Sequence, residues 1–150
     1  MTANIYLPHI DHLLRGLHVT RARLASRTKI AIDTALLRAL LQAIVAALPF
    51  DEAFYRARNP DIEAAFRAGQ ITDLHRHFVE TGYLEGRFGA PPPVDEAFYA
   101  ATYKDIGAAI ARGEMPSAAE HYLRAGAAEG RLPCADLRAE VERWASVLAE

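Results

Sequence analysis

The chain has 150 residues, a formal net charge of −2, one cysteine and 30 alanines, against only 22 valine, isoleucine and threonine residues together. Because alanine favours helix and the β-branched residues favour strand, this composition predicts an all-α protein. A single cysteine excludes an internal disulfide and a cysteine cage for zinc, and the longest apolar stretch is too short to span a bilayer. The N-terminus has no basic start followed by an apolar run, so we expect a cytoplasmic protein.

Residues 1–48 are predicted to form a helical hairpin. Proline is absent between Ile10 and Leu48, and apolar residues recur there at helical spacing in two sets that are out of phase. We expect two helices joined by a tight turn near residues 25–29, and one long helix with a stutter is the alternative. The second set has heptad-like spacing and predicts an apolar seam that is buried on the rest of the chain or on another copy: Ile30, Leu37, Leu41, Ile44 and Leu48.

The same N-terminal region is basic, with six Lys or Arg and two Asp, whereas residues 49–150 carry 11 basic and 17 acidic groups. This asymmetry could let opposite ends of two copies attract, or steer an anionic partner to residues 1–48. Nucleic-acid binding is disfavoured because the pI is about 6.3 and no aromatic residues interleave with the arginines. Peripheral contact of basic residues 15–29 with anionic lipid is a further alternative, and a solvated helix face is the simplest interpretation.

An internal repeat follows. Residues 51–87 return as residues 95–131 at a constant offset of 44, with 16 of the 37 positions identical. We interpret this as a duplicated helical module and assign the first copy to residues 49–92 and the second to residues 93–133. Residues 134–150 have apolar side chains spaced by four, three and four, which predicts an amphipathic helix that caps the second copy.

Each copy is predicted to contain three short helices and a closing Glu-Gly-Arg turn. In the first copy the helices begin at Asp51, at Asn59-Pro60-Asp61 and near Thr72 or Asp73. Asn59 is expected to cap the second helix, and Ser117 to cap the third helix of the second copy in a capping box with Glu120. Two pairs of repeated glycines follow helical runs and suit the left-handed backbone conformation: Gly69 with Gly113, and Gly82 with Gly126.

The repeated pattern is Phe/Val-Asp-x-x-x-Tyr, Asn-Pro-Asp-Ile, Ala-Ala, Gly, His-Phe/Tyr, Gly and Glu-Gly-Arg. It resembles a short helical repeat of many bacterial proteins, which occurs beside glycosyltransferase domains, in proteins of surface-polysaccharide biosynthesis and in some large secreted proteins. The resemblance covers residues 49–133 and implies a setting in exopolysaccharide biosynthesis rather than a reaction. It does not extend to residues 1–48 or 134–150, and the chain has no room for a glycosyltransferase domain.

The polar residues that recur in both copies are candidates for one ligand site in each: His77, Glu85 and Arg87, and their counterparts His121, Glu129 and Arg131. Arginine offers a planar donor to an anion or a sugar, and histidine and glutamate offer further hydrogen bonds. In the structural alternative, each arginine pairs with an aspartate of its own copy and fastens the closing turn to the first two helices. We favour this alternative, since charges that recur beside glycines in a duplicated small module commonly brace it.

The sequence offers no catalytic, cofactor-binding or metal-binding set. The serines lack a Gly-x-Ser-x-Gly elbow, no glycine-rich phosphate loop is present, and the His-x-x-His and His-x-His pairs lack a third ligand at metal spacing. We therefore expect no cofactor and no enzymatic activity. An enzyme that uses the histidines remains a third hypothesis, and it would require a deep pocket at His77 or His121.

Taken together, the patterns predict a non-catalytic helical scaffold or accessory protein that binds other proteins, forms homo-oligomers and acts in bacterial exopolysaccharide biosynthesis or export. Carbohydrate binding by the repeats is the alternative function. Both hypotheses draw on aromatic side chains that are offered to a partner or else fill the core: Phe54, Tyr55, Tyr83, Phe98 and Tyr99.

Overall fold

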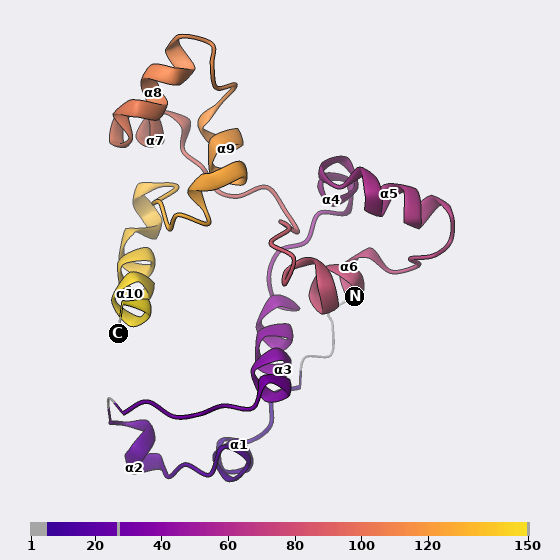
Figure 1. Ribbon diagram of the computed structural model, residues 1–150, viewed down its shortest axis with the longest axis vertical. Coiled ribbons are helices and arrows are strands. Elements are labelled where there is room, and N and C mark those ends of the chain that lie inside the picture. The colour runs from indigo at the N-terminus through magenta and orange to yellow at the C-terminus, as the bar shows by residue number, and fades with distance from the viewer. Residues whose placement is uncertain (1–5, 27, 150) are drawn as a thin grey trace. The chain divides into compact units, whose positions relative to one another are not determined.

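The computed structural model describes residues 6–26 and 28–149, and over those residues the protein consists of helices and irregular connections without a strand (Figure 1). The predicted all-α fold is confirmed. The chain divides into two compact units, one ending at Ala90 and the other beginning at Pro91. No helix within the described residues is long and apolar enough to cross a membrane.

The first unit opens with three helices rather than the predicted two, namely α1 (Ile10–Leu17), α2 (Arg21–Leu24) and α3 (Thr34–Val45). Helix α1 ends because His18 adopts a left-handed conformation, with φ 53°. Thr20 then caps α2 by accepting a hydrogen bond from the Arg23 amide at 3.2 Å.

The connection to α3 is also longer than the tight turn predicted near residues 25–29. The described residues between α2 and α3 include an irregular stretch, 28–33, that ends at Asp33. The Asp33 carboxylate accepts from the Ala35 amide at 2.8 Å and so starts α3. Polar side chains that cap helices locally therefore divide this segment into more helices than the apolar periodicity predicted.

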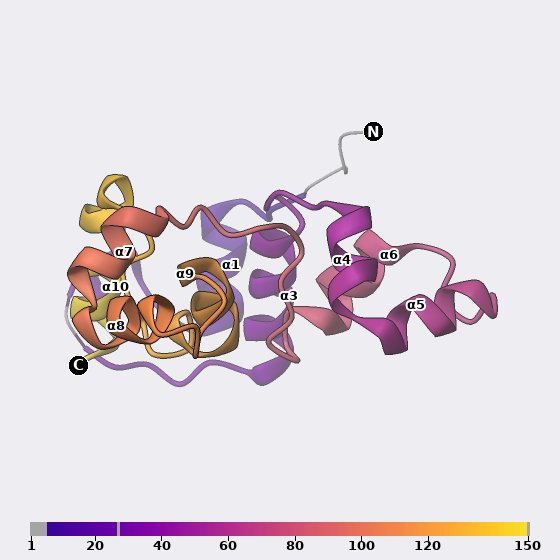
Figure 2. The ribbon, with the colours of Figure 1, turned by 90° about the horizontal axis from the view of Figure 1, so that it is seen from above.

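The first repeat contains the three predicted helices, α4 (Glu52–Arg58), α5 (Pro60–Arg67) and α6 (Leu74–His77), which lie together in Figure 2. Helix α6 continues into a π-helical turn, η1 (Phe78–Gly82). The predicted starts are confirmed by their caps, because Asp51 accepts from the Phe54 amide at 2.9 Å and Asp73 accepts from the Arg76 amide at 2.8 Å. Pro60 occupies the first turn of α5, as expected.

The second repeat reproduces this plan with α7 (Glu96–Thr102), α8 (Lys104–Ala111), α9 (Ala118–His121) and a second π-helical turn, η2 (Tyr122–Gly126). Ser117 caps α9 through the Glu120 amide at 3.0 Å, as predicted. The Glu120 carboxylate, however, accepts from Arg124, and the Glu96 carboxylate accepts from the amides of Ala118 and Ala119 instead. Glu96, which lies 22 positions before Ala118, thus adds acceptors for two further amides at the start of α9.

Each unit has its own buried cluster, centred on a tyrosine that is fully inaccessible to solvent. In the first unit Tyr55 packs with the side chains of Val45, Ile62, Leu74 and Phe78. In the second unit Tyr99 packs with Ile106 and Ala118. Val45 is the residue through which α3 is anchored to the first repeat.

The C-terminal segment forms a 3₁₀ turn, η3 (Ala135–Leu137), and then α10 (Arg138–Leu148), close to the predicted helix. Only the first part of the apolar face that was predicted to cap the second repeat is shielded from solvent. Val141 is half-buried, but Trp144, Val147 and Leu148 are 57, 61 and 77% exposed. The second half of the apolar face of α10 is therefore uncovered.

The glycines divide into two classes that the sequence alone did not separate. Gly69 and Gly113 have φ 73° and end helices, as predicted. Gly82 and Gly126 do not have positive φ, so that prediction is wrong for this pair. They lie in the π-helical turns, where a Cβ atom on Gly82 would come within 2.2 Å of the Tyr55 hydroxyl oxygen and one on Gly126 within 2.3 Å of that of Tyr99.

Candidate functional site

The repeated histidines bond to the buried tyrosines rather than lining a shared pocket with the arginines. His77 Nδ1 lies 3.0 Å from the Tyr55 hydroxyl, and His121 Nδ1 lies 2.9 Å from the Tyr99 hydroxyl. His121 is itself buried. Burial raises the pKa of both phenols, that of Tyr99 to about 12. The two rings of each pair are therefore held together by a hydrogen bond worth about 1 kcal/mol.

Arg87 is held by a dense set of acceptors within the first repeat. Its guanidinium donates to both carboxylate oxygens of Asp61, at 2.7 and 3.0 Å, and also to Glu85 and to the Asn59 side chain. The bidentate bond holds the pKa of Asp61 below its ordinary value. This is the brace expected in the structural alternative, since it ties the closing turn to the start of α5.

Asn59 has a different task from the helix cap that the sequence predicted. No hydrogen bond from α5 reaches its side chain. Its amide nitrogen donates to the Tyr55 carbonyl oxygen at 2.7 Å, and its amide oxygen accepts from Arg87 at 2.8 Å. Asn59, itself only 8% exposed, therefore links the end of α4 to the closing turn.

Arg131, the counterpart of Arg87, is held in another way. It donates to Glu129, lies 3.7 Å from an Asp105 oxygen and stacks over Tyr103, with the guanidinium carbon 4.8 Å from the ring centroid. The Tyr103 hydroxyl accepts from the Leu132 amide at 2.7 Å. Tyr103 occupies the position that Asn59 has in the first copy. The side chain at this position therefore contacts the closing turn in both copies.

These contacts place the six repeated polar residues in two braced turns and in hydrogen bonds to two buried tyrosines. Most of the aromatic residues that were candidates for partner contact are also shielded from solvent. Tyr55 and Tyr99 are fully buried and so fill the core, the second of the two predicted alternatives, and Phe54 and Phe98 are half-buried. Tyr83 is 41% exposed. A sugar that stacks on aromatic rings near Arg87 and Arg131 would find few of them accessible.

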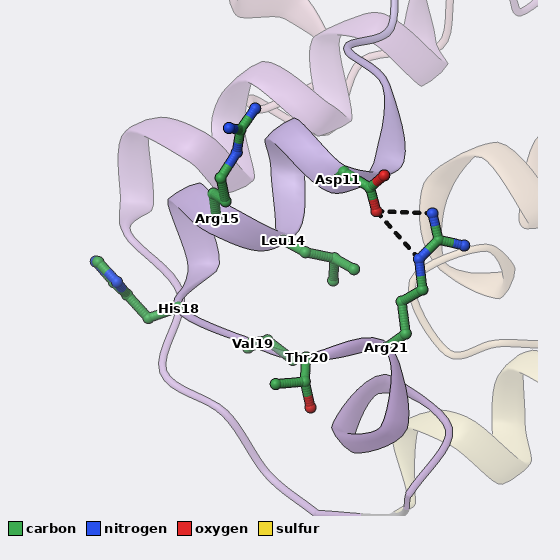
Figure 3. A pocket seen from close by; sticks show the side chains of 7 residues that line it. All are labelled: Asp11, Leu14, Arg15, His18, Val19, Thr20 and Arg21. Carbon is green, nitrogen blue, oxygen red and sulfur yellow. Dashed lines mark hydrogen bonds and ion pairs between the residues drawn. The ribbon is translucent and has the colours of Figure 1, made fainter.

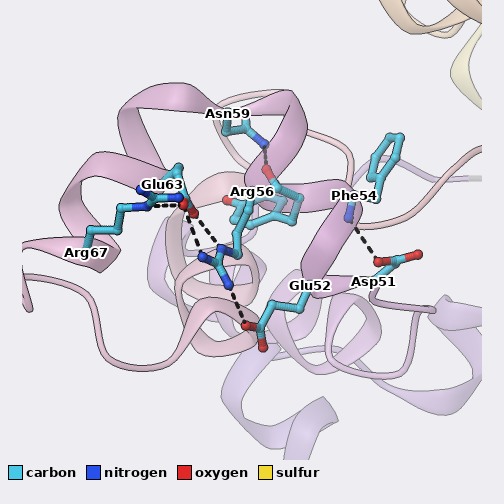
Figure 4. A network of polar contacts seen from close by, with 8 residues as sticks. Asp51, Glu52, Phe54, Arg56, Asn59, Glu63 and Arg67 are labelled. Carbon is cyan, nitrogen blue, oxygen red and sulfur yellow. Dashed lines mark hydrogen bonds and ion pairs between the residues drawn. The ribbon is translucent and has the colours of Figure 1, made fainter.

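A second polar network joins α4 to α5 on the surface of the first repeat (Figure 4). Glu63 accepts from Arg56 and from Arg67, and Arg56 also lies 3.6 Å from Glu52. The two arginines lower the pKa of Glu63 to about 2. The network is internally neutralised, which favours a role in fastening the two helices over a role in binding an ion.

The basic N-terminal region surrounds a surface hollow of about 710 Å³ beside α1 and α2. Figure 3 shows Arg21 turned toward Asp11, whose carboxylate it meets at 2.7 Å, while Arg15 and His18 point away from that pair. Arg15, Arg23 and Lys29 are exposed, and Arg27 lies outside the described residues. Leu14, which lies on α1 before these basic residues, is only 5% exposed.

The predicted apolar seam is the feature that the fold leaves open to solvent. Leu37 and Ile44 lie on α3 and are 42 and 61% exposed, whereas Leu41 is half-buried. Ile30 and Leu48 are exposed too, but they lie in the irregular segments before and after α3, so the seam is helical only in its middle. Leu84, 42% exposed, borders the same face across a shallow hollow of about 380 Å³.

The tyrosine–histidine pair and the glycine contact were missed at the level of sequence, although a signal was present. Tyrosine, histidine and glycine recur in both copies at identical separations. Residues kept at fixed separations in a duplicated module are expected to touch one another, as these do.

No protein-family model, curated protein or solved structure matches the chain. Within the described residues, no three His, Cys, Asp or Glu side chains gather as a metal ion would require. The functional argument therefore rests on the geometry of the chain itself.

Proposed function

We propose that the protein is a helical scaffold that associates with other protein chains, its own copies included, through the exposed apolar face of α3. The observation that carries the proposal is the exposure of Leu37 and Ile44 on a helix that is anchored to the first repeat through Val45. Apolar side chains on an anchored helix stabilise an association by being removed from water. The mechanism is burial of a preformed surface and involves no chemical step.

The setting that we propose is bacterial surface-polysaccharide biosynthesis or export. It is supported by the resemblance of residues 49–133 to the short helical repeat that accompanies glycosyltransferases. The role of the repeats in this proposal is to hold α3 rigidly, since Tyr55 and Val45 share one buried cluster. The exopolysaccharide machinery would then supply the partner chains.

Self-association is tested by comparing single carboxylates placed on two faces of α3. Ile44→Glu puts a charge into the exposed apolar face, whereas Ala39→Glu puts the same charge on an exposed position of the opposite face. We expect light scattering to give a concentration-dependent mass for the wild type and for Ala39→Glu, and a monomer for Ile44→Glu. Circular dichroism should give the same helix content for all three. A wild type that is monomeric at every concentration contradicts the self-association.

The setting is tested by affinity capture from the native host with the wild type and Ile44→Glu as paired baits. We expect glycosyltransferases or polysaccharide-export proteins among the chains that the wild type retains and Ile44→Glu loses. Recovery of such proteins by neither bait contradicts the proposed setting. Equal recovery by both baits contradicts the proposed surface.

A further inference from the structure

Helix α10 carries a second uncovered apolar face. Trp144, Val147 and Leu148 are each more than half exposed, and Val141 continues the same stripe toward the second repeat. The spacing of Val141, Trp144 and Leu148 by three and four residues matches the spacing of Leu37, Leu41 and Ile44 on α3 by four and three. Stripes of this kind are the surfaces through which pairs of helices pack.

The face of α3 is shaped to receive a bulky side chain. The hollow of about 380 Å³ is lined by Leu37, Leu41 and Leu84, with Arg38 among the residues of its wall. An arginine beside apolar side chains suits an indole ring, because a guanidinium cation is attracted to the ring face while the ring buries apolar surface. Trp144 is the one tryptophan of the chain, and it is 57% exposed.

Charge distinguishes the regions that carry these two faces. Residues 1–48, which include α3, hold six basic and two acidic groups, a net of +4. Residues 91–150, which include α10, hold six basic and ten acidic groups, a net of −4. The region that carries α3 is therefore attracted to the region that carries α10 in another copy, and this attraction favours an α3–α10 contact between copies.

We infer that α10 of a second copy of this chain docks on the α3 face, with Trp144 in the hollow beside Arg38. The inference rests on the proposed self-association and names its reciprocal surface. A copy that carries both faces can exchange two contacts with one neighbour or extend to further neighbours. A copy that lacks one face can form a single contact.

Tryptophan emission provides a direct reading of this contact, because Trp144 is the sole tryptophan. We expect the emission of the wild type to shift to shorter wavelength as concentration rises, with the same midpoint as the rise in mass by light scattering. Trp144→Ala should weaken the association by at least about tenfold, as expected for a central aromatic anchor. Emission that does not change across the rise in mass overturns the inference.

Complementary variants separate this contact from others. Leu37→Glu/Ile44→Glu removes the α3 face, and Val147→Glu/Leu148→Glu removes the α10 face. Ser146→Glu, on the opposite side of α10, is the matched control. We expect each double variant to be monomeric alone, an equal mixture of the two to form a complex of two chains, and Ser146→Glu to behave as the wild type.

The outcomes distinguish the inference from the proposal on which it rests. If the α3 variant is monomeric while the α10 variant associates like the wild type, α10 is not the partner surface and the inference is overturned, although self-association through α3 stands. If the wild type itself is monomeric with unchanged emission, both are overturned. A helix content by circular dichroism equal to that of the wild type establishes that each variant is folded.

Discussion

The contact between a buried tyrosine hydroxyl and a glycine defines the interior of each repeat at the scale of single residues. The hydroxyl of Tyr55 lies against Gly82 and bonds to His77, and Tyr99 meets Gly126 and His121 in the same manner. The absence of a Cβ at the glycine is what admits the phenol to hydrogen-bonding distance of the histidine. Glycine is kept here for close approach, whereas Gly69 is kept for its left-handed backbone.

Gly126→Ala tests whether this glycine is required for close approach of the tyrosine, because the substitution should then lower the free energy of unfolding. The added Cβ would lie 2.3 Å from the Tyr99 hydroxyl oxygen, so we expect the free energy of unfolding to fall by about 1–3 kcal/mol. Gly16→Ala is the matched control in α1, where a Cβ meets nothing within 4 Å, and it should raise the free energy by about 0.5–1 kcal/mol. Urea unfolding followed by circular dichroism measures both.

Tyr99→Phe tests whether the cost of Gly126→Ala arises from the collision with the Tyr99 hydroxyl. It removes the hydroxyl with which the new methyl group collides, so Gly126→Ala should cost less in the Tyr99→Phe background than in the wild type. An undiminished cost in the phenylalanine background would show that the glycine is required for some other reason.

At the scale of the element, the two closing turns reach one backbone geometry with different side chains. Gly86 and Gly130 both have positive φ, 79° and 69°, within the Glu-Gly-Arg turns. In both copies a backbone hydrogen bond then joins the end of the module to its start, from Asp51 to Gly89 and from Asp95 to Pro133. The identical Glu-Gly-Arg in the sequence marks these turns. The position of Asn59 and Tyr103 supports the closing turn in both copies, but this is not evident from the sequence because the two residue types differ.

The helix starts of the repeats were predictable from sequence because they depend on local chemistry. An aspartate or serine three residues before an amide it can accept from is visible within a short window, as at Asp51 and Ser117. The break of the N-terminal hairpin at His18 was missed although the cap at Thr20 is equally local, since Thr20 accepts from the Arg23 amide. The apolar spacing continues past His18, and it indicated a helix that runs through this point.

The ion pairs of Glu63 between α4 and α5 are expected to make the free energy of unfolding depend on pH in the acid range. Its pKa is lowered to about 2 by Arg56 and Arg67, from about 4.3 in an unfolded chain. The contribution of the charged carboxylate is therefore fully present above about pH 4.5 and is lost as pH falls toward 2. We expect Glu63→Gln to be less stable than the wild type at pH 6 and to approach the stability of the wild type at pH 3.

Urea unfolding at the two pH values measures this difference. Glu140→Gln is the control, because its exposed pair with Arg143 lies within one helix and contributes little. Since the Arg67 partner of Glu63 is 75% exposed, 1 M salt should reduce the difference at pH 6. An equal gap between Glu63→Gln and the wild type at both pH values would contradict the assignment.

At the scale of the whole molecule, the duplication has produced two separate cores rather than one enlarged core. The cluster around Tyr55 draws only on residues before Ala90, and the cluster around Tyr99 only on residues after Pro91. The high apolar fraction of the sequence is thus divided between two small clusters and a set of exposed faces on α3 and α10. The repeat in the sequence indicated duplication, but only the structure assigns residues 1–48 to the unit of the first copy.

Separate cores predict separate unfolding when the chains are dilute enough to be monomeric. Gly82→Ala should raise amide hydrogen exchange in peptides from residues 51–87 and leave residues 95–131 unchanged, and Gly126→Ala should do the reverse. Exchange measured by mass spectrometry at low urea resolves the two sets of peptides. The pair is internally controlled, because the same substitution with the same clash is made at equivalent positions, 2.2 and 2.3 Å from a tyrosine oxygen. If either substitution raises exchange equally in both sets, the chain unfolds as one cooperative body. The two copies of the module would then depend on each other for stability.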